Sequence, residues 1–190
     1  MRTYKIDGIV LRRRNIGEAD RILTVLSKNG GKISVKAPGV RRIPSRRSSH
    51  VELLNLSQLT IYGSSKSFLP IVTEAQTLDD FSSIKNDLNK IGYAYYICEL
   101  INGLCPDNQE NRNVFFRFHS TLSELSKTVS EIDISKIVRN FEIQLLSELG
   151  FWSEAKLLDV QGSRMVMEKL LERKLKAIRI MPLFAQQSAS

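Results

Sequence analysis

Arginine clusters are the residues whose type and spacing most clearly imply chemistry. The first cluster is the consecutive run Arg12, Arg13 and Arg14. The second lies within the segment PGVRRIPSRRSS and consists of two pairs, Arg41 with Arg42 and Arg46 with Arg47. A guanidinium group donates paired hydrogen bonds to phosphate oxygens, and serine hydroxyls can donate as well. The pattern therefore favours contact with the phosphate backbone of a nucleic acid over a charge that only solvates a small sheet.

The distribution of charge supports the same interpretation. The chain has 190 residues and a net charge of +8, from 28 Lys and Arg against 20 Asp and Glu. The first 50 residues hold thirteen basic and three acidic side chains, whereas residues 81–150 hold seven and nine. This asymmetry indicates an anion-binding face on one half of the chain. The candidate contacts are Arg12, Arg13, Arg14, Arg21, Lys32, Lys36, Arg41, Arg42, Arg46 and Arg47.

Metal and catalytic sites have little support. Glu18 and Asp20 would suit acid–base or Mg²⁺ chemistry, but we expect both carboxylates to pair with Arg21 and shape a turn. Cys98 and Cys105 are expected to be small buried residues, because no CxxC motif occurs and both histidines lie far away in the sequence. The G-x-x-x-x-G-K-[ST] phosphate loop is absent. We expect no metal, no cofactor and no enzymatic activity.

Composition predicts a folded cytoplasmic protein. Two cysteines cannot form a disulfide framework, which favours a reducing compartment. The apolar fraction of 42% and the charged fraction of 25% are ordinary for a globular protein. No stretch approaches the roughly 18 consecutive apolar residues of a membrane span, so no membrane contact is expected.

The elements that position the arginines are predicted from a change in hydrophobic period near residue 80. Before it, short apolar runs alternate as strands do, and the segment 38–49 is expected to be extended and mobile. Five short strands favour a small Greek-key barrel, with an OB-fold as the leading candidate and an SH3-like barrel fitting almost as well. The predicted strands are residues 3–12, 20–27, 32–37, 51–62 and 66–76.

Beyond residue 80, apolar residues recur at spacings of three and four, which predicts helices. The predicted helices are residues 81–104, 113–129, 133–150 and 163–175. We therefore predict an α+β protein in which an N-terminal five-stranded OB-fold barrel, residues 1–80, precedes an α-helical domain, residues 81–185, and a frayed tail, residues 186–190.

Aromatic side chains that could stack on bases are few in the basic half. They are Tyr4, Tyr62 and Phe68, and the last two are also candidates for the core. We therefore expect binding dominated by the nucleic-acid backbone and tolerant of sequence.

Several spaced motifs match a known family pattern. Residues 17–26 fit G-E-x-D-R-[IL]-L-T-x-[LF], and residues 37–42 fit A-[KP]-G-x-[RK]-[RK]. Looser matches are Tyr95-Tyr96-x-x-Glu99-Leu100, Phe141-Glu142-x-x-Leu145-Leu146-x-x-Leu149-Gly150 and Arg173-Lys174-Leu175-Lys176. Together these motifs resemble the RecO family, the bacterial mediators of DNA repair and recombination.

The resemblance implies an N-terminal OB-fold and a helical C-terminal domain in a nucleoid-associated protein. It also implies binding of single- and double-stranded DNA, strand annealing and cooperation with RecR. The family helps load RecA onto DNA coated by single-strand-binding protein and contacts the acidic C-terminal tail of that protein. Arg139, on the polar side of the third predicted helix, is a candidate contact for this tail. Many relatives carry a cysteine-bearing zinc loop after the position of Phe151, where this chain has SEAKLLDVQGS, so zinc is not carried over.

The leading hypothesis is a non-catalytic protein that binds DNA and anneals strands. Phosphate contacts alone do not distinguish DNA from RNA, so an RNA-binding OB-fold protein of translation or RNA handling is the first alternative. A metal-dependent nuclease using Glu18 and Asp20 is the second. The third is a scaffold whose basic half meets an acidic partner or an anionic lipid.

Overall fold

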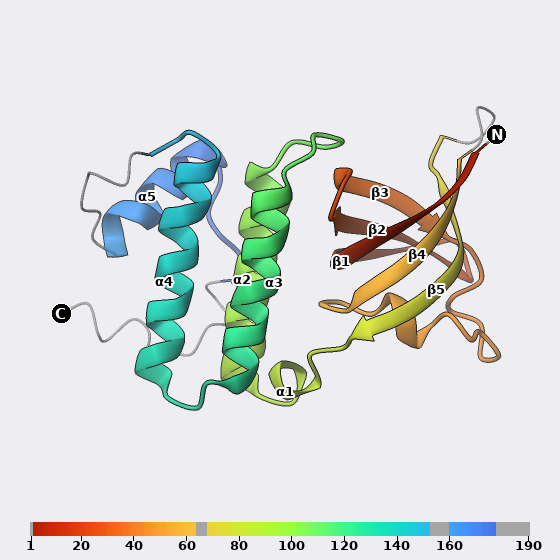
Figure 1. Cartoon of the computed structure of the whole chain (residues 1–190), viewed down its shortest axis with the longest axis horizontal. Coiled ribbons are helices and arrows are strands. Elements are labelled where there is room, and N and C mark those ends of the chain that lie inside the picture. Colours follow the sequence, from red (N-terminus) through yellow and green to blue (C-terminus); the bar gives the residue numbers. More distant parts are fainter. Residues whose placement is uncertain (1, 64–67, 153–159, 178–190) are drawn as a thin grey trace. The chain divides into compact units, whose positions relative to one another are not determined.

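The first part of the chain is a five-stranded barrel. A computed structural model describes residues 2–63, 68–152 and 160–177. The strand order β1-β2-β3-β5-β4 closes on itself because β1 pairs with both β2 and β4 (Figure 1). β3 and β5 pair in parallel, and this pairing joins Lys36 to Ile71. The strands are β1 Arg2–Ile16, β2 Asp20–Ser27, β3 Gly31–Ala37, β4 Leu56–Gly63 and β5 Ile71–Asp79. The predicted OB-like fold is confirmed.

Alternating side chains build the interior of the barrel. Val10, Leu23, Val35, Leu59 and Ile61 are fully buried in one cluster. In β3 and β4, these residues alternate with residues that are only partly buried. β1 runs along two partners, because residues 2–9 pair with β4 and residues 8–16 pair with β2, and its register with β2 shifts between Val10 and Arg12. This bulge changes which residues of β1 face outward, and so it orients the arginine cluster.

The fourth predicted strand is only partly correct. Residues 49–51 form a short 3₁₀ helix, and β4 begins at Leu56. Leu54 between them has a φ of 67°, and its N–H donates to the carbonyl of Val10 at 2.9 Å. The apolar residues that look like one long strand therefore include a tight bend that packs across β1. The start of the fifth predicted strand lies outside the described residues, and β5 extends to Asp79.

The second part of the chain is helical, as predicted. Its helices are α1 Ser82–Lys85, α2 Leu88–Leu104, α3 Arg112–Lys127, α4 Glu131–Glu148 and α5 Val160–Leu170 (Figure 1). The single helix predicted over residues 81–104 is two helices, because Asp87 caps α2 by accepting from the N–H groups of Asn89 and Lys90 at 2.9 and 3.2 Å. Gly150, with a φ of 76°, follows the end of α4.

The described chain divides into two compact units near the predicted boundary. One contains residues up to Asp80 together with Pro106–Phe115, and the other contains Phe81–Cys105 and the described residues from Phe116 onward. Residues 106–115 join the barrel unit because Asp107 Oδ1 lies 3.1 Å from Lys32 Nζ. The predicted frayed tail, residues 186–190, lies outside the described residues.

The helical unit has its own core. α4 packs against α2 and α5, and the rings of Phe118 in α3 and Phe141 in α4 lie 6.3 Å apart. The side chains of Cys98 and Cys105 are buried and are not joined in a disulfide, and burial raises the pKa of Cys98. Among the described residues, no helix has the length and apolar character to cross a membrane.

Candidate nucleic-acid interface

The outer face of β1, β2 and β3 carries rows of polar and basic side chains. Arg12 is opposite Thr24, and Thr24 is opposite Ser34. Directly paired residues of antiparallel strands point to the same face. In the next row Arg14 is opposite Ile22, which is opposite Lys36. Both Arg12 and Arg14 are exposed, and neither forms an ion pair with any residue that the structure describes. Their guanidinium groups are therefore available to an anion.

Arg13 lies between these two residues and points to the opposite side of β1. Its guanidinium group is already engaged and is therefore less available to an anion. Its guanidinium pairs with Glu52, whose other carboxylate oxygen lies 3.1 Å from Nη1 of Arg21. Arg21 also donates from Nε to the side chain of Asn15 at 3.2 Å. Two of the candidate contacts thus share one carboxylate near the end of the barrel. Glu52 was missed in the sequence because its partners are distant along the chain.

The segment 38–48 is folded rather than extended, which corrects the prediction. Successive turns are closed by hydrogen bonds from Arg42 N to Gly39 O, Ser45 N to Arg42 O and Ser48 N to Ser45 O, at 3.0–3.3 Å. Arg47 closes the base of the segment, with Nη2 donating to Pro38 O at 2.7 Å and Nη1 donating to a carbonyl of β5 at 2.6 Å. Arg47 is therefore a structural arginine.

The other end of this segment is tied to the turn between β1 and β2. The N–H of Gly39 donates to Asp20 Oδ1 at 2.8 Å, and Arg41 donates from its backbone N to Ala19 O and from Nη1 to Gly17 O, at 2.9 and 3.0 Å. These contacts hold the exposed side chains of Arg42 and Arg46, and the exposed part of Arg41, near the outer face of β1–β3.

Lys36 and Lys32, the two lysines of β3, are both engaged. Lys36 Nζ lies 2.8 Å from Asp20 Oδ2. Its hydrogen bond, with a second from the N–H of Gly39, lowers the pKa of Asp20. Lys32 is buried and pairs with Asp107. The prediction that Asp20 pairs with Arg21 is therefore wrong, because the turn directs this carboxylate toward β3.

The arrangement presents cations that can bind anions, and the two carboxylates considered for catalysis have other surroundings. Asp20 is used by Lys36 and Gly39, and Glu18 is exposed. Among the described residues, no group of three or more His, Cys, Asp or Glu side chains could hold a metal ion. Of the ten candidate contacts named from the sequence, the exposed ones are Arg12, Arg14, Arg41, Arg42 and Arg46. We name this set the exposed arginines.

The aromatic candidates differ in exposure. Tyr4 packs against the barrel core and Tyr62 is half-buried, whereas the side chain of Phe68 is 99% exposed. Of the two environments that the sequence allowed for Phe68, the core is therefore excluded. Its position between turn residues and Pro70 was the signal that this aromatic lies in a loop.

Arg139 is not on an open polar surface, contrary to the prediction. Its Nη1 donates to Glu142 Oε2 at 3.1 Å and also contacts the hydroxyl of Ser163. The hydroxyl of Tyr96 donates to the other oxygen of Glu142 at 2.6 Å. Burial raises the pKa of Glu142, although these hydrogen bonds oppose that effect. Arg139 therefore compensates a buried carboxylate within the helical unit.

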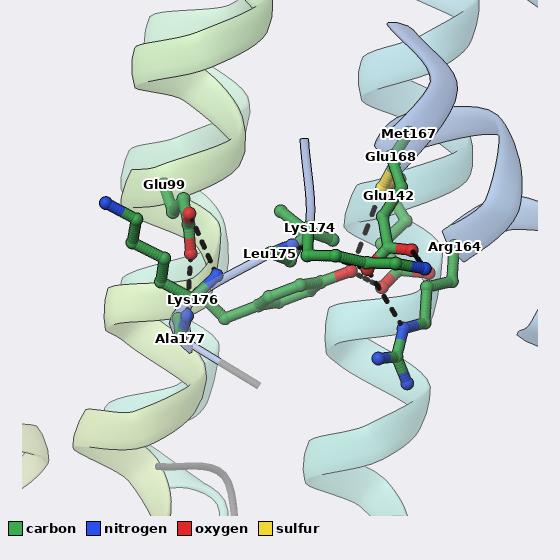
Figure 2. Close-up of polar contacts among 10 residues, drawn as sticks. Glu99, Glu142, Arg164, Met167, Glu168, Lys174, Leu175, Lys176 and Ala177 are labelled. Atoms are coloured by element: carbon green, nitrogen blue, oxygen red, sulfur yellow. Dashed lines mark hydrogen bonds and ion pairs between the residues drawn. The ribbon is translucent and has the colours of Figure 1, made fainter. Parts of the chain in front are cut away.

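The segment after α5 is held by two further carboxylates. Figure 2 shows Glu99 of α2 facing the backbone of Lys176 and Ala177, whose N–H groups donate to it at 3.0 and 2.7 Å. Burial alone would raise the pKa of Glu99, but these hydrogen bonds and the contact with Arg173 outweigh burial and lower it. Glu168 pairs with Lys174 at 2.9 Å.

Comparisons with known proteins agree with this architecture. The family model "Recombination protein O N terminal" matches residues 1–81, and "Recombination protein O C terminal" matches residues 85–153. The DNA repair protein RecO of Acetivibrio thermocellus is 36% identical over 151 residues, which are 80% of this chain and 59% of that protein. The DNA repair protein RecO of Roseiflexus sp. is 36% identical over 150 residues, 79% of this chain and 51% of its own length.

A third relative, the DNA repair protein RecO of Desulforamulus reducens, is 31% identical over 163 residues, which are 86% of this chain and 61% of that protein. The matched part thus spans between about half and three fifths of these relatives. Both family models follow the order of the two units, the barrel first and the helices second. The chain belongs to the recombination protein O family.

Proposed function

We propose that this protein is a DNA-binding mediator of DNA repair and homologous recombination. It binds single- and double-stranded DNA through the outer face of β1–β3 and the segment 38–48, and it promotes annealing of complementary strands. The observation that carries the proposal is the set of exposed arginines, gathered on one part of a barrel in a member of the recombination protein O family.

The proposed mechanism is electrostatic and needs no covalent chemistry. Each exposed guanidinium donates to phosphate oxygens and releases condensed counterions. The serine hydroxyls of the segment 38–48 and the Thr24–Ser34 row add neutral donors. Two strands bound at a basic surface repel one another less, which raises the rate at which complementary sequences meet. We therefore propose a binding protein and not an enzyme.

The proposed partners follow from the family. We propose that the protein acts with RecR, contacts the acidic tail of single-strand-binding protein and so helps RecA load indirectly. The helical unit is the proposed partner-binding module, because the exposed arginines all belong to the barrel unit. Arg139 is not proposed as the tail contact, since Glu142 and Ser163 already engage its guanidinium.

The test compares two variants that remove the same charge. The first replaces Arg12, Arg14, Arg42 and Arg46 with Ala. The control replaces Arg112, Lys127, Lys136 and Lys169, which are exposed on helices. We expect the first variant to lose DNA binding and annealing at low salt and the control to retain both. Equal losses would show that only net charge matters, and full activity of the first variant would contradict the proposed interface.

Two further arms separate the alternatives. RNA of matched sequence should displace bound DNA no better than unlabelled DNA does. A strong preference for RNA would contradict a role in DNA repair. Prolonged incubation with DNA and Mg²⁺ or Mn²⁺ should leave the DNA intact, whereas cleavage by the purified protein would contradict a non-catalytic role.

A further inference from the structure

Phe68 is an exposed aromatic side chain near the edge of the outer face of β1–β3. It belongs to the connection between β4 and β5, and its side chain is 99% exposed. Two residues later, the carbonyl of Pro70 accepts a hydrogen bond from the N–H of Lys36 at 2.8 Å. Two residues of chain span at most about 7 Å. The backbone of Phe68 therefore lies close to the end of β3.

The position of Lys36 connects Phe68 to the exposed arginines. Lys36 is opposite Ile22, and Ile22 is opposite Arg14 on the same outer face. With strands about 4.8 Å apart, Arg14 lies roughly 10 Å from Lys36 across the sheet. From the connection before β5 across to β1, the residues thus follow in the order Phe68, Lys36, Ile22 and Arg14. This order suits a strand whose phosphates contact the arginines while a base reaches the ring.

We propose that Phe68 is a stacking platform for an unpaired nucleobase and gives the barrel a preference for single-stranded over duplex DNA. This inference rests on the proposed function. Every base has a flat face that can stack on an aromatic ring, so such a contact tolerates all sequences. Bases in a duplex already stack on one another and reach the ring only after costly unstacking. Arginine contacts to phosphate do not make this distinction, because both forms of DNA present phosphates.

The chain offers a matched control for exposure alone. Ile43, in the segment 38–48 between Arg42 and Arg46, is also fully exposed. Its aliphatic side chain has comparable apolar character but no aromatic face. If burial of any apolar side chain against DNA were sufficient, Ile43 and Phe68 would contribute alike. If stacking is the contribution, only Phe68 matters.

The experiment measures the affinity of the full chain for an oligothymidylate strand and for a duplex of the same length at one salt concentration. We expect Phe68→Ala to weaken single-strand binding about 5- to 100-fold and to leave duplex binding unchanged within about twofold. The slope of affinity against salt should not change, because no charge is removed. Ile43→Ala should leave the ratio of the two affinities unchanged.

Phe68→Trp provides a second readout. It should retain the single-strand preference, and the added indole fluorescence should be quenched by the single strand but not by the duplex. The wild-type chain, whose only tryptophan is Trp152, supplies the fluorescence background. The inference is overturned if Phe68→Ala lowers both affinities equally or neither, or if Ile43→Ala matches its effect. If the wild-type chain binds neither form of DNA, the proposed function itself fails.

Discussion

Adjacent arginines of one cluster should have opposite roles, and substitution can separate them. Arg13 pairs with Glu52, whereas Arg12 and Arg14 face outward without a described partner. We compare Arg13→Ala with the double substitution of Arg12 and Arg14 by Ala. The first should lower stability and the second should lower DNA affinity, although both change the same three-residue stretch.

The cost of removing Arg13 follows from its environment. Its side chain is 23% exposed and that of Glu52 is 38% exposed, so the pair is only partly shielded from water. Glu52 keeps Arg21 at 3.1 Å after the substitution. A charged hydrogen bond lost from such a site costs about 1–2 kcal/mol. In a unit of this size, each kcal/mol of stability that is lost lowers the unfolding temperature by about 4–8 °C.

The outward-facing pair should behave differently. Exposed substitutions of this kind change stability by only about 0.5 kcal/mol. Each phosphate contact on single-stranded DNA contributes about 0.7 to the slope of log affinity against log salt. At 0.1 M salt, one contact is then worth about fivefold in affinity and two contacts about 25-fold.

Thermal unfolding by circular dichroism and binding by fluorescence anisotropy measure the two effects on the same samples. Arg13→Ala should lower the unfolding temperature and leave the affinity of the folded protein close to wild type. The double variant should show the reverse. The assignment of roles would be refuted if Arg13→Ala weakened binding more than the double variant while its unfolding temperature stayed at the wild-type value.

Three other contacts give predictions of the same kind. Asp20→Ala should speed trypsin cleavage within the segment 38–48, because the N–H of Gly39 loses its acceptor. The backbone N–H groups of Lys176 and Ala177 donate to Glu99. Glu99→Gln should raise the hydrogen-exchange rate of these two amides by about 10- to 100-fold, since a neutral amide oxygen is a weaker acceptor. Gly31→Ala should lower the unfolding temperature strongly, because an added Cβ would lie 1.9 Å from the carbonyl oxygen of Gln109.

Each of these predictions has a control or a second readout. The pKa of Asp20 is lowered, so its anchoring is complete above the ordinary value of 3.8 and is lost as the pH falls through the lower, folded-state pKa. In an NMR titration, the amide signal of Gly39 should therefore change with a midpoint below 3.8, and a higher midpoint would contradict the anchor.

For Gly31→Ala, the control is Gly17→Ala, because Gly17 also has a positive φ but nothing lies within 4 Å of an added Cβ. Equal destabilisation by Gly17→Ala and Gly31→Ala would exclude the steric explanation. For Glu99→Gln, unchanged exchange at both amides would show that the carboxylate does not hold the C-terminal segment.

The barrel and the helices could be predicted because their signals are local. Val35 and Ala37 alternate with lysines in β3, and only a strand with one buried face needs that pattern. The break at Asp87 was harder to predict, because apolar spacing continues through it. Leu54 was misassigned to a strand because its positive φ depends on packing against β1, which no short stretch of sequence reveals.

The candidate interface was predicted as a region but not residue by residue. Arginine type and density identify an anion-binding half, yet the sequence does not tell a bound arginine from an available one. Glu52, which engages both Arg13 and Arg21, is 39 residues from the first and 31 residues from the second. Arg139 looked exposed by helical periodicity, but the packing of α5 against α4 brings Ser163 to it. Such long-range pairings are set by the tertiary fold.

The most direct test of the account is the salt dependence of single-strand binding by the full chain. Wild-type protein should give a linear fall of log affinity with log salt. Replacing Arg12, Arg14, Arg42 and Arg46 by Ala should make that slope shallower by about 3, because each contact contributes about 0.7. An unchanged slope in this variant would contradict the claim that the exposed arginines form the DNA interface.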